Sequence, residues 1–244
     1  MNPVLAKLNL HSPLTSASEE AIEALVLRTA RRIQPRRDLF RAGDRPRSGF
    51  LMIEGWALRY KSLADGRRQV TALLLPGDVF DLHTYLAEEV DDTVSAVTAL
   101  TVAVLSKSDF EQLTETYPSL TKAFLWEQLV ETAVDREWLQ NIGRRDGPER
   151  VAHLLCEIMV RLRMVGLAEA NHCHFPLTQS HLAEMTGLTP IHVNRVIKAL
   201  RSEGLISLSG QTLAVPDLPE LMRRAFFDPG YLHLEGNEAL FTGP

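Results

Sequence analysis

The sequence is poor in cysteine and lacks long apolar runs. Only Cys156 and Cys173 occur among its 244 residues, too few for a disulfide scaffold or a four-thiolate zinc or iron–sulfur site. No apolar stretch approaches the about 18 residues of a membrane-spanning helix. The first residues also lack the basic and apolar segments of a secretory signal. These absences predict a cytoplasmic protein with reduced thiols and no membrane span.

Excess positive charge and catalytic motifs are missing as well. The 26 Lys and Arg residues face 31 Asp and Glu residues, for a net charge of −5, so the chain is not a polybasic binder that relies on phosphate neutralisation alone. It contains no Gly-rich phosphate loop, serine elbow or pair of HExxH-type histidines, and this predicts that it is not an enzyme. A hydrophobic share of 45% excludes a disordered chain.

The first half of the chain is predicted to contain a helix followed by a β-rich region. Residues 14–33 have helical spacing of apolar residues, with Thr15 or Ser16 as the cap. From about 34 to 106, short runs of β-forming residues alternate with Gly, Asp and Pro, which is typical of an all-β barrel or sandwich. Asp65-Gly66 is placed to form a hairpin turn there, because Gly adopts positive φ without strain.

A long helix is predicted from Pro118 to about Ile142, ended by Gly143, after a short helix over Phe110–Tyr117 with its cap at Ser108-Asp109. Apolar residues recur along the long helix at spacings of three and four: Ala123, Trp126, Val130, Ala133, Val134, Trp138 and Ile142. This stripe can cover the β-rich region or pair with a second copy of the helix. A domain boundary is expected at 143–148, followed by an amphipathic helix over 149–165 and a loop over 166–173.

Residues 177–206 have the pattern of a helix-turn-helix. Thr178 can cap the first helix and Gly187 can end it with positive φ, while Thr189 caps the second helix and Pro190 takes its first position. The inner face of the second helix is predicted to be buried, through Val193, Val196, Ile197 and Leu200. Residues 207–215 then resemble the β-hairpin of a winged variant.

The outer face of the second helix predicts DNA binding. Between Thr189 and Arg201 the sequence has three basic residues and no acidic one, and residues 144–224 hold 10 basic against 8 acidic residues. Arg195 can donate two hydrogen bonds to guanine, Asn194 can read adenine, and Lys198 suits a phosphate. The candidate DNA-contacting residues are Thr178, Gln179, Ser180, Thr189, Ile191, His192, Asn194, Arg195 and Lys198.

With these motifs the chain resembles the Crp/Fnr family of bacterial transcription regulators. The resemblance implies an α+β fold with a cyclic-nucleotide-binding-like β-barrel or jelly roll over 12–110, a helical region with the dimerisation helix over 111–143, and a winged helix-turn-helix over 144–220. It implies a homodimer on near-palindromic double-stranded DNA, with RNA polymerase as a further partner. It places Thr178 on a phosphate-contacting position, Arg195 on the recognition arginine and Lys198 on a basic position one turn later.

The sequence also departs from the family pattern. Cyclic-nucleotide-binding members continue the Gly-Asp turn with Gly-Glu and later place Arg-Ser at the cyclic phosphate. Here Gly77-Asp78-Val79-Phe80 is followed by Asp81-Leu82, and residues 88–93 contain four carboxylates and no arginine. We therefore expect no cyclic AMP binding, no iron–sulfur cluster and no other cofactor. The sequence does not identify a small-molecule effector. Pro190-Ile191 replaces the Arg-Glu of members that read TGTGA, which predicts a different half-site.

Two other functions remain open at the level of sequence. One is a cyclic-nucleotide-responsive regulator with a non-standard pocket. Separately, His83 follows Asp81 near the expected ligand site and could tune an effector pocket. The other is a cupin-type metal enzyme, which would need several histidines in the barrel, although His83 is the only histidine between 12 and 152. On a strand, His172 and His174 would share one face and Cys173 the other, so these three are not expected to form a metal site.

Overall fold

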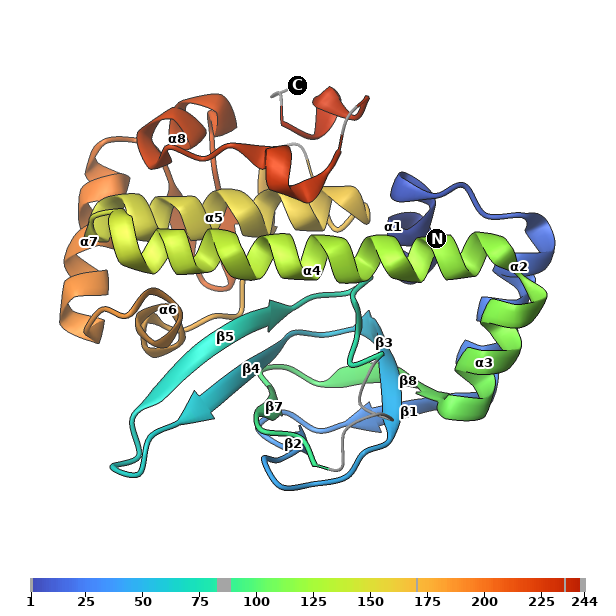
Figure 1. The fold of residues 1–244 in the computed structure, drawn as a ribbon. Helices are drawn as coiled ribbons and strands as arrows, with labels where there is room; N and C mark the ends of the chain where they lie inside the picture. Colours follow the sequence, from blue (N-terminus) through green and yellow to red (C-terminus); the bar gives the residue numbers. More distant parts are fainter. Residues whose placement is uncertain (1, 83–88, 170, 235, 242–244) are drawn as a thin grey trace. The chain divides into compact units, whose positions relative to one another are not determined.

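The computed structural model describes residues 2–82, 89–169, 171–234 and 236–241 (Figure 1). The chain divides into two compact units, residues 1–63 with 72–132 and residues 64–71 with 133–244, and each is described by itself. Within the described residues, no helix combines the length and apolar character needed to cross a membrane.

Two helices precede the strands of the first unit. Helix α1 (Pro3–His11) was not predicted from the sequence, whereas α2 (Ser16–Thr29) was, with Thr15 as its N-cap. The predicted helix boundary at 33 is wrong. Residues Ala30–Ile33 instead form β1, because their backbone groups pair with those of β8 (Leu100–Ser106).

The β-rich region forms two four-stranded sheets, with strand orders β1-β8-β3-β6 and β2-β7-β4-β5. The other strands are β2 (Asp38–Phe40), β3 (Ser48–Glu54), β4 (Ala57–Ser62), β5 (Arg68–Leu74), β6 (Val79–Phe80) and β7 (Thr93–Ala96). The architecture is therefore jelly-roll-like, and the described strands do not close into one barrel. Stacked rings of Phe40, Phe50 and Phe80 lie in the core.

Two turns of the β-rich region depend on glycine, and one of them is the predicted Asp65-Gly66 turn. Gly66 at the β4–β5 hairpin has a φ of +85°, and Gly55 between β3 and β4 has a φ of +91°. A Cβ atom on Gly55 would lie 2.2 Å from the carbonyl oxygen of Ala99. This turn therefore requires glycine both for its backbone conformation and for the close approach of the chain.

A buried ion cluster ties α1 to the rest of the first unit. Lys7 Nζ lies 2.8 Å from Asp78 Oδ1 and 2.6 Å from Glu127 Oε2, and the backbone N–H of Leu75 donates to Asp78 Oδ2 over 2.7 Å. Burial raises the pKa of Glu127, although Lys7 acts in the opposite direction. The acidic residue of the Pro76-Gly77-Asp78 turn is thus used internally.

The predicted helices after β8 are present with shifted ends. Helix α3 (Lys107–Thr116) is capped by Ser106, two residues before the predicted cap. Helix α4 (Pro118–Arg144) starts as predicted but continues through Gly143, which keeps a negative φ. Of the predicted stripe, four residues are buried within the single chain, Ala123, Val130, Ala133 and Trp138, and Ala123 belongs to the core of the first unit. The buried residues of the stripe therefore pack against other parts of their own chain.

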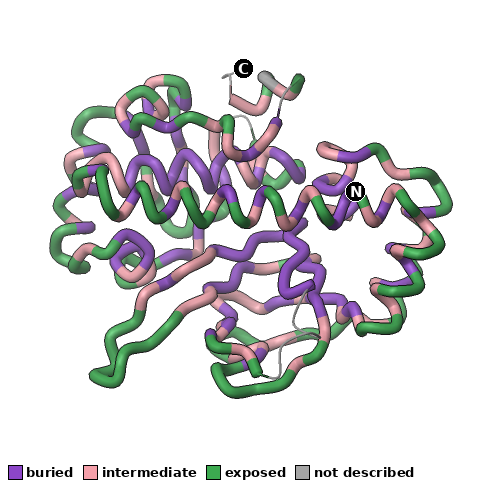
Figure 2. Tube along the Cα trace, viewed as in Figure 1, coloured by how far each residue is buried: buried purple, intermediate pink, exposed green. Residues whose placement is uncertain are grey.

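The second unit is built around α5 (Gly147–Met164), which packs against α6 (Gln179–Thr186), α7 (Pro190–Ser202) and α8 (Leu218–Ala225). Figure 2 shows α5 buried along most of its length. The segment predicted as a loop over 166–173 contains β9 (Ala168–Glu169) and the start of β10 (His172–His174), since both pair in the sheet β11-β12-β10-β9. Its other strands are β11 (Ser207–Ser209) and β12 (Thr212–Ala214).

Candidate nucleic-acid interface

Helices α6 and α7 form the predicted helix-turn-helix. The Thr178 hydroxyl accepts from the His181 N–H over 3.2 Å, and His181 Nδ1 accepts from the Thr178 N–H over 3.2 Å. Burial lowers the pKa of His181, which favours the neutral ring that can accept this bond. Gly187 ends α6 with a φ of +67°, and the Thr189 hydroxyl caps α7 by accepting from the His192 N–H.

The amphipathic pattern of α7 is confirmed. Val193, Val196, Ile197 and Leu200 are buried, as the sequence predicts. Arg195 and Lys198 are exposed, and Asn194 is half-buried. The other candidates are exposed as well: Thr178, Gln179, Ser180, Thr189, Ile191 and His192.

Two of the candidate side chains are already connected. Asn194 Nδ2 donates to Gln179 Oε1 over 3.1 Å, which joins the outer face of α7 to the first turn of α6. An amide held in this way still has a second N–H and a carbonyl oxygen with which it can bind a further partner. Such a pre-arranged amide suits the adenine edge, which presents one acceptor and one donor in the major groove.

Cations dominate the exposed side of α7. Arg195, Lys198 and Arg201 are exposed, and within the part of the chain that the structure describes none of them forms an ion pair. Because no carboxylate among the described residues pairs with them, their charge is available to an external anion. Long, unpaired basic side chains on one helix face are the footprint of a surface that meets phosphates and guanine edges.

His192 occupies a special place at the start of α7. A Cβ atom on Gly147, the first residue of α5, would lie 2.8 Å from His192 Nε2. The exposed imidazole therefore lies close to the start of α5. The sequence did not indicate this proximity of His192 to α5.

The wing is present after α7. Strands β11 and β12 pair from Ser207 with Ala214 to Ser209 with Thr212, and Gly210 turns between them with a φ of +58°. Gln211 Oε1 lies 3.1 Å from His174 Nε2, so the exposed tip is tied to β10. Residues 207–215 thus form the predicted hairpin.

The sequence also offered His172, Cys173 and His174 as metal-ligand types and His83 as an effector-tuning residue. Among the described residues, no three His, Cys, Asp or Glu side chains gather as metal ligands would. Cys173 is buried on β10 while His174 is exposed, in agreement with the predicted alternation along a strand. His83 and Glu88 lie outside the described residues.

The sheets of the first unit enclose an arginine that sequence reasoning missed. Arg59 on β4 contacts Asp81 Oδ2 at 3.0 Å and Asp92 Oδ2 at 3.1 Å, and its guanidinium lies 6.0 Å from the Phe80 ring centroid. Burial raises the pKa of Asp81 to about 6, although Arg59 opposes this shift. One arginine in a strand carries no sequence signal of its own, because its partners lie more than twenty residues away.

Comparison with known proteins agrees with both halves of the structure. Residues 30–117 match the cyclic nucleotide-binding domain model, and residues 149–224 match the Crp-like helix-turn-helix domain model. The transcriptional activator protein FnrL of Cereibacter sphaeroides is 30% identical over 212 residues, which cover 85% of each chain. The nitrogen fixation regulation protein FixK of Bradyrhizobium diazoefficiens is 29% identical over 171 residues, which cover 70% of each chain.

Solved structures show the same fold. The structure of FixK2 from Bradyrhizobium japonicum superposes with a TM-score of 0.71 at 24% identity, covering 80% of this chain and 96% of that one. A CooA mutant from Carboxydothermus hydrogenoformans gives a TM-score of 0.67 at 18% identity, covering 87% and 97%.

Together, the jelly-roll-like sheets, the long α4 and the basic winged helix-turn-helix define a transcription regulator of the winged-helix class, not an enzyme. The chain belongs to the Crp/Fnr family. Regulators of this family bind DNA and act as dimers.

Proposed function

We propose that this regulator reads a near-palindromic DNA site as a homodimer, through the exposed side of α7, and does so without cyclic AMP. This proposal rests chiefly on one observation, the exposed cations Arg195 and Lys198 beside the fixed Asn194–Gln179 amide pair. Arg195 then contacts guanine, Asn194 contacts adenine and Lys198 contacts phosphate. Thr178, Gln179, Ser180 and Thr189 approach the backbone from the helix N-termini, and Ile191 and His192 lie beside the bases.

The domains follow from the same proposal. Residues 12–110 act as a sensor or scaffold, residues 111–143 carry the dimer contact, and residues 144–220 bind DNA. RNA polymerase is the downstream partner, and the site of action is the cytoplasm. The FnrL and FixK relatives are a transcriptional activator and a nitrogen fixation regulation protein, which supports a role in transcription control for this chain.

A second copy has an exposed apolar surface to meet on α4. Leu125, Leu129 and Leu139 are 67%, 42% and 74% exposed. Spacings of four and ten residues place them on one side of a helix, opposite the buried stripe. Exposed leucines in such a row are typical of a helix that pairs with another. Sedimentation should show a dimer for the native chain and a monomer for Leu129→Glu, with Leu27→Glu, an exposed leucine on α2, as the matched control.

The absence of cyclic AMP binding follows from the charges inside the jelly roll. The Arg59 side chain there is 13% exposed, and Asp81 and Asp92 already contact it at 3.0 and 3.1 Å. A cyclic phosphate would have to displace one of these carboxylates and then face it across a short distance, which is unfavourable in a poorly hydrated interior. Calorimetric titration with cyclic AMP should give no heat of binding, and a micromolar affinity would contradict this part of the proposal.

The experiment that tests the DNA-binding function is selection of bound duplexes from random DNA with the full chain. We expect enrichment of two inverted half-sites whose centres lie about one helical turn apart. The half-site should contain a guanine that becomes dispensable in Arg195→Ala. Recovery of unenriched sequences at low salt would contradict sequence-specific recognition. Repeating the selection with metabolite extract tests for a small-molecule effector.

A further inference from the structure

The chain continues past the matched helix-turn-helix domain, and this continuation is packed rather than loose. Helix α8 ends at Ala225, and residues 226–240, with the short helices η1 (Pro229–Leu232) and η2 (Glu238–Leu240), follow it. Leu232 and Leu234 are 1% and 4% exposed. We propose that residues 226–234 and 236–240 form a C-terminal clasp, which fastens the last turns of α4 to α5 and so fixes the direction in which the DNA-binding helices leave α4.

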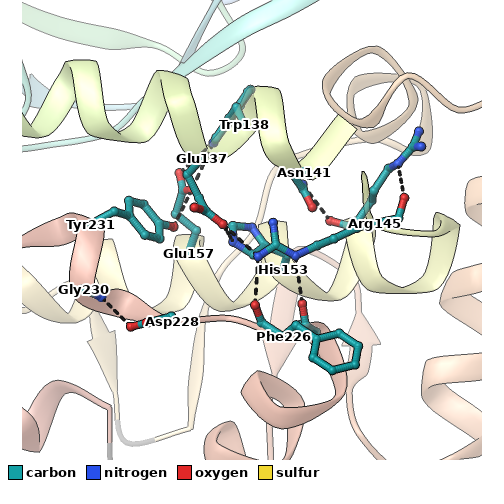
Figure 3. Close-up of polar contacts among 12 residues, drawn as sticks. Glu137, Trp138, Asn141, Arg145, His153, Glu157, Phe226, Asp228, Gly230 and Tyr231 are labelled. Carbon is teal, nitrogen blue, oxygen red and sulfur yellow. Dashed lines mark hydrogen bonds and ion pairs between the residues drawn. The ribbon is translucent and has the colours of Figure 1, made fainter. Parts of the chain in front are cut away.

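The first contact of the clasp is made at the break between the two helices. Arg145 lies between the end of α4 and the start of α5, and its side chain is 8% exposed. Its guanidinium donates to the carbonyl oxygens of Ala225 at 3.1 Å and Phe226 at 2.8 Å, and to Glu137 Oε1 at 2.8 Å (Figure 3). The Arg145 side chain thus joins the end of α8 to the junction between α4 and α5 and to α4 about two turns earlier.

Backbone strain supports a built contact at this point. Phe226 has a φ of +48° although it is not glycine, and its side chain is exposed. A bulky residue in the left-handed region costs about 1 kcal/mol or more. The strain persists because Arg145 holds the carbonyl that this conformation presents.

The second contact is an aromatic stack over a buried histidine. His153 on α5 is fully buried, and its Nε2 atom lies 3.0 Å from Glu137 Oε1 on α4. Its ring is 4.9 Å from the Phe227 ring and 6.1 Å from the Tyr231 ring between centroids, nearly parallel to the latter at 17°. Two rings of the clasp therefore cover the histidine that links α5 to α4.

The third contact converges on a buried carboxylate. Glu157 on α5 is 0% exposed. Trp138 Nε1 from α4 donates to it at 3.0 Å, the Tyr231 hydroxyl from the clasp at 2.8 Å, and Arg161 from α5 itself at 3.1 Å. A buried carboxylate is tolerated only with such partners. Because two of the three donors come from other elements, losing the clasp would leave Glu157 short of a partner and loosen Trp138.

The clasp has a fourth contact near the far end of α5, where Arg163 donates to the carbonyl oxygen of Leu240 over 2.9 Å. The segments it joins, the last turns of α4 and residues 226–240, fall outside the two matched domain models, which end at 117 and 224.

Fixing α4 to α5 matters for the dimer, and this step rests on the proposed function. If α4 pairs with a second α4, its junction with α5 sets the separation of the two α7 helices. A fixed junction would accept one half-site spacing, whereas a loose junction would accept several. The clasp is thus a positioning element, since it touches neither bases nor phosphates.

Hydrogen–deuterium exchange of the full chain tests the clasp without DNA. The variants are Tyr231→Phe, which removes only the hydroxyl, and a chain ending at Phe227; Tyr117→Phe in the first unit is the matched control. We expect the amides of residues 137–145 to exchange about tenfold faster or more in both clasp variants, and at the native rate in the control. Native exchange rates in Tyr231→Phe and in the shortened chain would overturn the proposal.

DNA binding then separates positioning from plain stability. Using the selected duplex with its spacer lengthened or shortened by one base pair, the native chain should lose about tenfold in affinity or more, while Tyr231→Phe should lose less than threefold. Affinity for a duplex with a single half-site should be equal in both proteins. Equal spacing preference in both proteins would reduce the clasp to a stabilising contact and overturn the positioning role. If the native chain binds no DNA, the proposed function fails, and the exchange rates still decide whether the clasp exists.

Discussion

Arg59 and Arg195 show the same side chain in two opposite environments. Arg59 lies between the sheets of the first unit, with carboxylates of Asp81 and Asp92 at 3.0 and 3.1 Å. Arg195 is exposed on α7 and forms no ion pair within the described part of the chain. An arginine surrounded by internal carboxylates cannot recruit an external phosphate, whereas an exposed and unpaired one can. The comparison shows how a protein with a net charge of −5 can present unpaired cations on one face while an internal arginine is held by carboxylates of its own chain.

The largest effect is expected from Arg59→Met. The substitution keeps much of the volume but leaves Asp81 and Asp92 without their cation, so the free energy of unfolding should fall by about 3–5 kcal/mol. Urea unfolding at neutral pH measures it. Arg32→Met removes an exposed arginine of β1 and should change the free energy of unfolding by less than about 0.5 kcal/mol. Equal effects of the two substitutions would contradict the distinction between internal and surface arginines.

The pH dependence of stability should change in Asp81→Asn. Because burial raises the pKa of Asp81 to about 6, the folded state binds a proton more tightly than the unfolded chain does. The stabilisation from this group is therefore complete below pH about 4 and is lost as the pH rises through about 6, by up to about 3 kcal/mol. Unfolding midpoints between pH 4 and 7 should fall less steeply with rising pH in Asp81→Asn than in the native protein.

Asp91→Asn is the matched control for this pH series. The hydrogen bond from Lys61 lowers the pKa of Asp91, so this carboxylate stabilises the fold above its unfolded pKa and loses the effect as the pH falls. Its removal should change the slope weakly and with the opposite sign, because the side chain is 82% exposed. Parallel pH profiles for Asp81→Asn and the native protein would contradict the assignment.

At the DNA face, Arg195→Ala should cost about 1–3 kcal/mol in binding to the selected site and should relax the preference for one base. Fluorescence anisotropy with the selected duplex and with duplexes substituted at single positions measures both quantities. The free energy of unfolding should stay within about 0.5 kcal/mol of the native value. A loss that is equal on all duplexes would assign Arg195 to phosphate contact instead.

The smallest effect is expected from Lys198→Ala. A lysine that meets phosphate contributes to all sequences alike, so affinity should fall uniformly, and the slope of log affinity against log salt should decrease in magnitude by about 1. Titrations at several salt concentrations give this slope. An unchanged slope would show that Lys198 releases no counterion on binding.

The helix-turn-helix was predictable because its signals are local. The Thr178 and Thr189 caps, the positive φ of Gly187 and the first-position Pro190 each lie within a few residues of the structure they determine. The burial of Val193 and Val196 follows from the same short period. The chemistry of the outer face of α7 could therefore be predicted before the structure, and its contacts with DNA stay a prediction.

The features that sequence reasoning missed depend on partners far along the chain. Lys7 looks like a surface lysine, yet it is buried against carboxylates 71 and 120 residues away. Glu157 looks like the polar side of a helix, but it accepts from a tyrosine 74 residues further on. Gly143 permits a helix end without requiring one, and α4 continues past it. Tertiary contacts determine the burial of Lys7 and Glu157 and the end of α4, and the periodicity of the sequence does not indicate such contacts.

Guanine protection from dimethyl sulfate on the selected duplex tests the central claim most directly, because it reports contact with the guanine N7 edge in the major groove. With the native chain, we predict two protected guanines in inverted half-sites about one helical turn apart. In Arg195→Ala the protection should disappear at those guanines and persist elsewhere in the footprint. Unchanged protection in Arg195→Ala, or no protected guanine with the native chain, would contradict recognition of DNA by the outer face of α7.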